Sequence, residues 1–127
     1  MKIEIFAPVT YNYSVLTNMT VYFNQTKKAE LSEIVYLEAI INSTKIHLKC
    51  GTVIKVGKTL KKFDGNLLPG NFFRVNRKCI CNLDLVKKIE SKNGHTSIII
   101  KGNQAIPISR RRRVSFENFL KNMACGL

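Results

Sequence analysis

Four consecutive arginines, Arg110 to Arg113, are the residues whose type and spacing point most directly to a chemistry. They follow Ile106-Pro107-Ile108-Ser109, where a C-terminal helix is expected to begin. A helix N-terminus carries partial positive charge, so cations placed there are unfavourable in the free protein. A phosphate backbone would reverse that effect, because guanidinium forks and exposed helix amides can bind it together. The alternative is a solvated basic turn in which Arg113 pairs with Glu117 one helical turn later.

Two further polar clusters fall in predicted connections between strands. The first combines cations with one amide, in Arg74, Asn76, Arg77 and Lys78. An arginine fork fits guanine and an asparagine amide fits adenine, so such a loop can both position the protein on DNA and specify individual bases. The second is Asn42-Ser43-Thr44-Lys45, a polar turn that follows Ile34 to Ile41. Three such turns could converge on one surface, although the sequence does not show that they do.

The overall charge favours a polyanion as the partner. The chain has 127 residues, with 21 Lys and Arg against 8 Asp and Glu, which gives a net charge of +13. This excess of positive charge destabilises a compact state, so a chain that carries it usually binds nucleic acid or an anionic membrane surface. The apolar runs are only strand-length and Met1 to Thr10 makes a poor signal peptide, so we expect no membrane contact and a cytoplasmic protein.

Metal, cofactor and catalytic chemistry are not expected. The cysteines, Cys50, Cys79, Cys81 and Cys125, fit reduced thiols, and Cys79 and Cys81 would share one face of a strand. A zinc site would need two more ligands near that pair. The two histidines, His47 and His95, adjoin no obvious nucleophile and no pair of carboxylates. An enzyme would need such groups together, so we predict a protein that is not an enzyme and needs no cofactor.

Short β-strands must position the polar turns. Runs rich in β-branched residues predict strands at Ile34 to Ala39, Lys45 to Leu48, Thr52 to Val56, Phe72 to Val75, Cys79 to Leu83, Thr96 to Lys101 and Ala105 to Ile108. Asn93-Gly94 indicates a hairpin, Cys50-Gly51 and Gly102-Asn103 indicate turns, and the short connections require antiparallel sheets. Leu60, Phe63, Leu67 and Leu68 indicate an internal helix over Thr59 to Leu68, with Thr59 as its cap and Pro69-Gly70 as its end.

The two ends of the chain have separate expectations. Helical spacing of Phe116, Phe119, Leu120 and Met123 predicts a C-terminal helix that packs its aromatic stripe on the sheet and closes at Gly126. Strands at Lys2 to Phe6 and Thr20 to Phe23 are also expected. We take residues 1–19 as an N-terminal extension and residues 20–127 as the main domain. Whether the extension packs on that domain is left open.

Several of these motifs, in this order, resemble the LytTR DNA-binding domains of bacterial LytR/AlgR-type transcription regulators. The resemblance runs over roughly residues 20 to 123 and rests on Ile34-Val35-Tyr36-Leu37-Glu38-Ala39, Lys45-Ile46-His47-Leu48, Thr59-Leu60-Lys61, Phe72-Phe73-Arg74-Val75-Asn76-Arg77, Asn82-Leu83 and Ile106-Pro107-Ile108-Ser109-Arg110. It implies a mainly β, elongated fold of short antiparallel sheets with one small internal helix and a C-terminal helix. It also implies loops that enter successive major grooves of double-stranded DNA at promoter repeats. Many relatives carry an N-terminal receiver domain, and we expect this chain to act without one.

The resemblance places the DNA contacts on the three polar turns. It implies base contacts by Asn42, Ser43, Asn76, Arg77 and Arg110. Phosphate contacts would come from Lys45, Arg74, Lys78, Arg111, Arg112 and Arg113. Relatives commonly have His in place of Asn76 and Ser in place of Lys78, so the operator of this chain is its own.

Other partners and functions stay open at this point. The alternatives are an RNA-binding or non-specific nucleic-acid-binding protein, in which Phe72 or Phe73 would stack on bases, and a basic protein-interaction module. A homodimer on direct repeats and an unidentified regulatory protein partner are also left open.

Overall fold

Short antiparallel sheets form most of the molecule. The computed structural model describes residues 3–6, 19–64 and 71–125. The central sheet has the strand order β6–β5–β4–β8–β7. Its strands are β4 (Ile34–Ile40), β5 (Ser43–Leu48), β6 (Val53–Val56), β7 (Phe72–Arg74) and β8 (Cys79–Asn82). Each neighbouring pair runs antiparallel, and a bulge interrupts the β4–β5 pairing between Ile34 and Tyr36.

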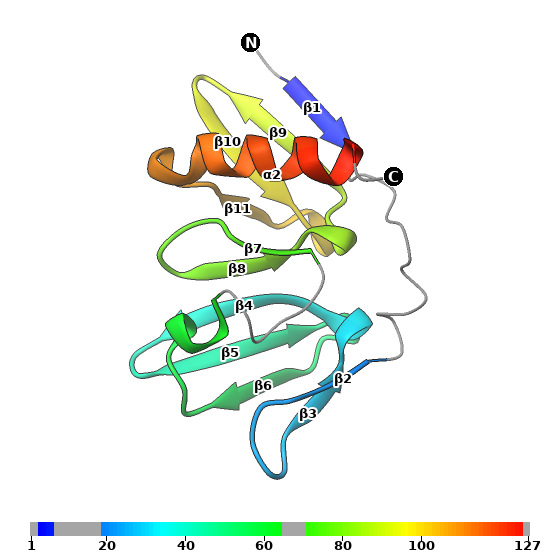
Figure 1. Cartoon of the computed structure of the whole chain (residues 1–127), viewed down its shortest axis with the longest axis vertical. Coiled ribbons are helices and arrows are strands. Elements are labelled where there is room, and N and C mark those ends of the chain that lie inside the picture. Colours follow the sequence, from blue (N-terminus) through cyan, green and yellow to red (C-terminus); the bar gives the residue numbers. More distant parts are fainter. Residues whose placement is uncertain (1–2, 7–18, 65–70, 126–127) are drawn as a thin grey trace.

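Two smaller sheets flank the central one. A four-stranded sheet has the order β1–β9–β10–β11 and a two-stranded sheet joins β2 to β3. Their strands are β1 (Ile3–Phe6), β9 (Lys88–Lys92), β10 (His95–Ile99), β11 (Ala105–Pro107), β2 (Thr20–Tyr22) and β3 (Lys28–Glu30). The sheets follow one another along the long axis of the molecule, and helix α2 (Arg113–Cys125) crosses the end that holds β9–β11 (Figure 1). The expected mainly β fold with a C-terminal helix is confirmed.

The central sheet carries a hydrophobic core on each face. The core beneath α2 contains buried side chains from all the surrounding elements, among them Val75, Cys81, Ile98, Ile106 and Phe116. The core on the other face, beneath β2 and β3, includes Phe23, Leu37, Ile46, Leu60 and Phe63. Successive side chains on a strand point to opposite faces, so short strands can serve both cores.

Phe72 and Phe73 show how this alternation assigns side chains. Phe72 packs against the core beneath β2 and β3, whereas Phe73 packs against the core beneath α2. The Phe73 ring lies 5.4 Å from that of Phe116 and 5.1 Å from that of Phe119, between ring centroids. Both phenylalanines therefore contribute to the packing of the domain, which argues against the base stacking that the RNA-binding alternative invoked.

The expected turns are found where the sequence places them. Asn93 and Gly94 have φ values of 54° and 77°, the sign that a type I′ hairpin requires, and they join β9 to β10. Gly51 has φ 94° in the turn between β5 and β6, and its N–H donates to the Leu48 carbonyl at 3.0 Å. Gly102 and Asn103 also have positive φ, of 81° and 61°.

The internal helix is shorter than predicted. It is a single 3₁₀ turn at Leu60–Phe63, and Asp64 has extended backbone angles that end it. Leu60 and Phe63 are buried, and their three-residue spacing suits a 3₁₀ turn. The prediction that the Thr59 side chain caps the helix is wrong; its carbonyl instead accepts from the Lys62 N–H at 3.0 Å. Leu67, Leu68 and Pro69-Gly70 lie outside the described residues.

In the described part of the chain, 3₁₀ turns also follow β3 and β8, at Leu31–Glu33 and Leu83–Leu85, and a 3₁₀ turn at Arg110–Arg112 leads into α2. Phe116 is buried, and Phe119 and Leu120 pack beside it, as the helical spacing predicts. Gly126 and the Met123 side chain lie outside the described part. At the other end of the chain, β1 pairs with β9 from Ile3 opposite Ser91 to Phe6 opposite Lys88. This pairing adds β1 to the sheet beside α2.

Candidate nucleic-acid interface

Three connections lie at one edge of the molecule, which we call the basic edge. They are the β4–β5 turn (residues 41–42), the β7–β8 connection (residues 75–78) and the segment that enters α2 (residues 109–112). Figure 1 shows the three along the left side of the molecule, one above the other. These are the turns in which the sequence placed its candidate DNA contacts. The sequence left their convergence open, and the fold brings them together.

Hydrogen bonds tie the middle connection to both of its neighbours. The Ala39 N–H, near the end of β4, donates to the Lys78 carbonyl at 2.7 Å. On the other side, the Ser109 N–H donates to the Val75 carbonyl at 2.9 Å. The Asn76 side-chain amide adds a bond to the Pro107 carbonyl at 2.6 Å. The spacing of the three connections is therefore fixed by direct contacts and not only by the sheets behind them.

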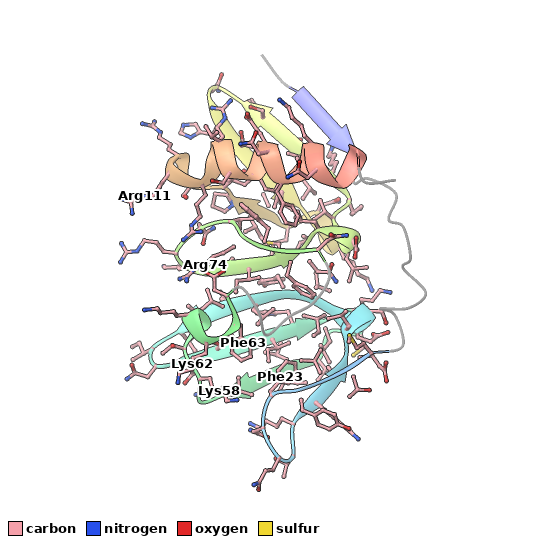
Figure 2. All side chains as sticks on the ribbon, in the orientation of Figure 1. Phe23, Lys58, Lys62, Phe63, Arg74 and Arg111 are labelled. Atoms are coloured by element: carbon pink, nitrogen blue, oxygen red, sulfur yellow. The ribbon has the colours of Figure 1, made fainter. Side chains whose placement is uncertain are left out.

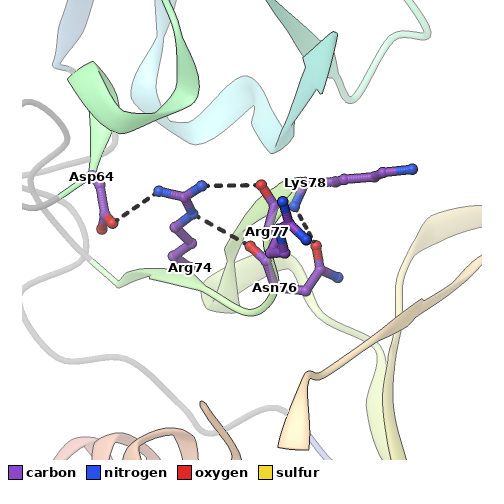
Figure 3. A network of polar contacts seen from close by, with 5 residues as sticks. All are labelled: Asp64, Arg74, Asn76, Arg77 and Lys78. Atoms are coloured by element: carbon purple, nitrogen blue, oxygen red, sulfur yellow. Dashed lines mark hydrogen bonds and ion pairs between the residues drawn. The ribbon is translucent and has the colours of Figure 1, made fainter. Parts of the chain in front are cut away.

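Arg74 and Asn76 shape the β7–β8 connection from within (Figure 3). The Arg74 guanidinium donates to the carbonyls of Asn76 and Arg77, at 3.3 and 3.0 Å, and lies 3.4 Å from the Asp64 carboxylate. The Asn76 side-chain oxygen accepts from the Lys78 N–H at 2.7 Å, while its amide nitrogen binds Pro107. Both side chains thus use their polar atoms inside the protein. This geometry favours a supporting role for them over the direct DNA contacts that the sequence predicted.

Other cations of the basic edge have exposed or half-buried side chains. Arg77, Lys78, Arg110 and Arg111 are exposed, and Arg112 is half-buried. Across residues 19–64 and 71–122, the guanidinium groups of Arg77, Arg110, Arg111 and Arg112 form no hydrogen bond or ion pair. Arg113 differs, because its guanidinium lies 3.4 Å from the Glu117 carboxylate and 3.4 Å from the Gly94 carbonyl. The solvated pair that the sequence offered as an alternative is therefore found for Arg113, but not for Arg110 to Arg112.

The β4–β5 turn supplies the third part of the edge. Ile40 pairs with Ser43, so Ile41 and Asn42 form the two-residue tip, with Asn42 at φ 54°. Asn42 is exposed, whereas Ser43 and Lys45 are half-buried on β5. The buried Thr44 hydroxyl donates to the Lys58 carbonyl at 2.7 Å and holds the turn against the segment before the Leu60–Phe63 turn.

Sequence reasoning missed one group of cations. Lys58, Lys61 and Lys62 are exposed around the Leu60–Phe63 turn. Figure 2 shows Lys58 and Lys62 on the side of the molecule that carries Arg74 and Arg111. The spacing Lys58-x-x-Lys61-Lys62 is the sequence signal that indicates this group of cations. Lys58 and Lys62 therefore add positive charge to the side of the molecule that carries the basic edge.

Arg74→Ala is expected to lower the free energy of unfolding by about 1–3 kcal/mol, because carbonyls in the β7–β8 connection lose their donor. The same change should weaken nucleic-acid binding, since Arg77 and Lys78 lose their fixed positions. Urea titration and binding assays measure the two effects. Lys78→Ala is the control: it removes one cation from the same connection but leaves its hydrogen bonds intact. Equal binding losses with no difference in stability would contradict a supporting role for Arg74.

Packing accounts for two of the thiols, Cys79 and Cys81, and for the His47 imidazole. Burial raises the pKa of Cys79 to about 11 and also raises that of Cys81, while Cys50 is exposed. The His47 ring stacks on Tyr36, with centroids 4.1 Å apart, and its Nε2 lies 3.0 Å from the Glu38 carboxylate. Among the described residues no cluster of three His, Cys, Asp or Glu side chains could hold a metal ion. None of their helices is both long enough and apolar enough to cross a bilayer.

A mainly β domain with a continuous basic edge is typical of proteins that bind nucleic acid. The comparisons identify the family: the model of the LytTr DNA-binding domain matches residues 24–121, so this chain belongs to the LytTR family of DNA-binding domains. Among solved structures, the chain is similar to the LytTr DNA-binding domain of a protein described as a methyl-accepting/DNA response regulator from Bacillus cereus. That match has a TM-score of 0.66 at 20% identity and covers 80% of this chain and 94% of the other. No curated protein matches the sequence.

Proposed function

We propose that this protein binds double-stranded DNA sequence-specifically, with the connections of the basic edge in the major groove, and regulates transcription. The observation that carries the proposal is the row of three hydrogen-bonded connections, two of which present exposed guanidinium groups without a partner among the described residues. An arginine fork that has no partner among the described residues can bind guanine or phosphate. Membership of a DNA-binding family supports the same function.

The proposed contacts divide into base contacts, phosphate contacts and residues that position them. Arg77, Arg110, Asn42 and Ser43 lie at or beside the tips and are proposed to contact bases. Lys45, Lys78, Arg111 and Arg112 are proposed to contact phosphates, with Arg111 and Arg112 in the 3₁₀ turn that leads into α2. Asn76, Arg74 and Arg113 have partners within the protein, so we assign them to positioning.

The regulatory part of the proposal rests on the family. A bacterial regulator of this kind acts on promoter DNA in the cytoplasm, and two copies on direct repeats would each place one basic edge in successive grooves. A regulatory protein partner would then bind a surface other than that edge.

Selection from a randomised duplex pool tests the proposed function. Selected duplexes are compared with scrambled duplex and single-stranded RNA at two salt concentrations. A recovered motif, repeated at about one helical turn if two copies bind, is the expected result. Equal affinity for every duplex would leave a non-specific binder, and preference for the RNA would overturn the proposal.

Arg111→Ala tests the assignment of phosphate contacts. We expect weaker binding to matched and scrambled DNA alike, and a salt slope reduced by about 1, because one fewer counterion is released. The affinity is measured on both duplexes over a range of salt. Lys121→Ala removes the same charge from an exposed position further along α2 and should change the slope less. A loss confined to the matched duplex would instead make Arg111 a base contact.

A further inference from the structure

Ile41 is an exposed apolar side chain at the tip of the β4–β5 turn. It is 92% exposed, more than any other exposed large hydrophobic residue in the described part of the chain. The other such residues are Met19, Tyr22, Val53 and Val114, with exposures between 43% and 67%. Single exposed apolar residues are common on protein surfaces, so exposure alone explains nothing.

The position of Ile41 within the turn makes its side chain unusual. Ile40 pairs with Ser43, which leaves Ile41 as the first of the two tip residues. Tight turns favour Gly, Asn, Asp and Pro, whereas a β-branched side chain is stiff and favours strands. Asn42 supplies the positive φ that the turn needs. Isoleucine therefore brings no advantage to the turn and no contact with a core.

The surroundings of Ile41 place it on the basic edge. The neighbouring Ala39 N–H is bonded to the Lys78 carbonyl, so the tip stands beside the β7–β8 connection with Arg77. The Thr44 hydroxyl holds the other strand of the hairpin to Lys58. A duplex bound along this edge would therefore meet Ile41 as well as the arginines, because the turn cannot fold back without breaking these bonds.

The chemistry of the major groove identifies what Ile41 can bind there. Base edges in that groove present hydrogen-bond donors and acceptors, and the thymine 5-methyl group is the apolar exception. We propose that Ile41 packs against a thymine methyl and specifies thymine at one position of the bound site. This inference rests on the proposed function, since it requires that the basic edge enter the major groove.

Replacement of thymine by deoxyuridine tests the contact, because it removes the methyl group and keeps the base-pairing edge. Each thymine of the selected duplex is replaced in turn, and the affinity of the wild-type protein and of Ile41→Ala is measured. At one position the wild-type protein should lose about three- to fivefold in affinity, as expected for one buried methyl group. Ile41→Ala should bind the two duplexes equally at that position. Ile41→Val, which keeps the branched carbon, should give an intermediate loss.

Val53→Ala is the matched control. Val53 is 47% exposed and pairs with His47, at the end of the β5–β6 hairpin away from the basic edge. This variant should respond to deoxyuridine as the wild-type protein does. Thermal unfolding should show that both alanine variants remain folded, since neither side chain is buried.

Two outcomes would overturn the inference: no deoxyuridine position that affects the wild-type protein, or the same loss in wild-type protein and Ile41→Ala at every position. Failure of the proposed function is distinguishable, because the selection itself would then recover no motif. A motif without the coupling at Ile41 would reject the thymine contact and leave sequence-specific binding intact.

Discussion

Replacing Arg77 and Arg110 together with Ala is expected to weaken binding to the selected duplex by about 2–6 kcal/mol, because each bidentate base contact contributes about 1–3 kcal/mol. Both guanidinium groups are exposed and free of partners among the described residues, so their removal breaks no bond within the fold. They extend from adjacent connections that the Ser109–Val75 bond holds together. The double variant should therefore lose both affinity and base preference while remaining folded.

Dissociation constants on matched and scrambled duplexes measure this effect. The control is Lys49→Ala with Lys121→Ala, which removes the same total charge from exposed positions away from the tips of the basic edge. We expect that pair to weaken both duplexes slightly and equally. If it matched the loss caused by the arginine pair, net charge would account for binding and the proposed base contacts would be wrong.

Phe116→Ala is expected to lower the free energy of unfolding by about 3–5 kcal/mol, because a large aromatic side chain leaves a cavity in a closed core. Phe116 is 1% exposed and packs against Phe73 across the α2–β7 interface. A loss of this size is a large part of the stability of a small domain. Since Phe116 also anchors the first turns of α2, binding through Arg110 to Arg112 should fall with it.

Urea or thermal unfolding measures the Phe116 effect. Val114→Ala serves as the control on the same helix, because Val114 is 67% exposed and its truncation should change stability by no more than about 0.5 kcal/mol. Similar losses for the two variants would show that α2 is not held by this aromatic contact.

The strands with β-branched runs could be predicted from the sequence, but β3 and β9 could not. Lys28–Glu30 and Lys88–Lys92 are short and mostly charged, and Ile89 is the buried residue of β9. Their strand geometry comes from pairing: β3 pairs with its hairpin neighbour β2, and β9 pairs with the adjacent β10 and with the distant β1. Local propensity carries no record of such partners. The internal helix predicted from the sequence is too long, because burial of Leu60 and Phe63 needs only one turn.

The location of the candidate site could be predicted from the sequence, but the hydrogen-bond partners of two of its residues could not. Basic and amide side chains between strands marked all three connections of the edge. The amide of Asn76, however, binds a carbonyl 31 residues away, and Arg74 binds carbonyls of its own loop. A side chain's type shows what it can bind, whereas its partner depends on the fold. The sequence alone therefore cannot distinguish a side chain that holds a loop in place from one that is free to contact DNA.

The bonds that join the three connections have a consequence for how this protein could acquire a new operator. Two of them, Ala39 to Lys78 and Ser109 to Val75, link main-chain atoms and do not depend on which side chains stand at the tips. Under the proposed function, substitutions at Ile41, Arg77 and Arg110 would then change the preferred bases while the distance between the connections stays constant. Variation, natural or engineered, can thus recode this surface one base pair at a time without remaking the scaffold.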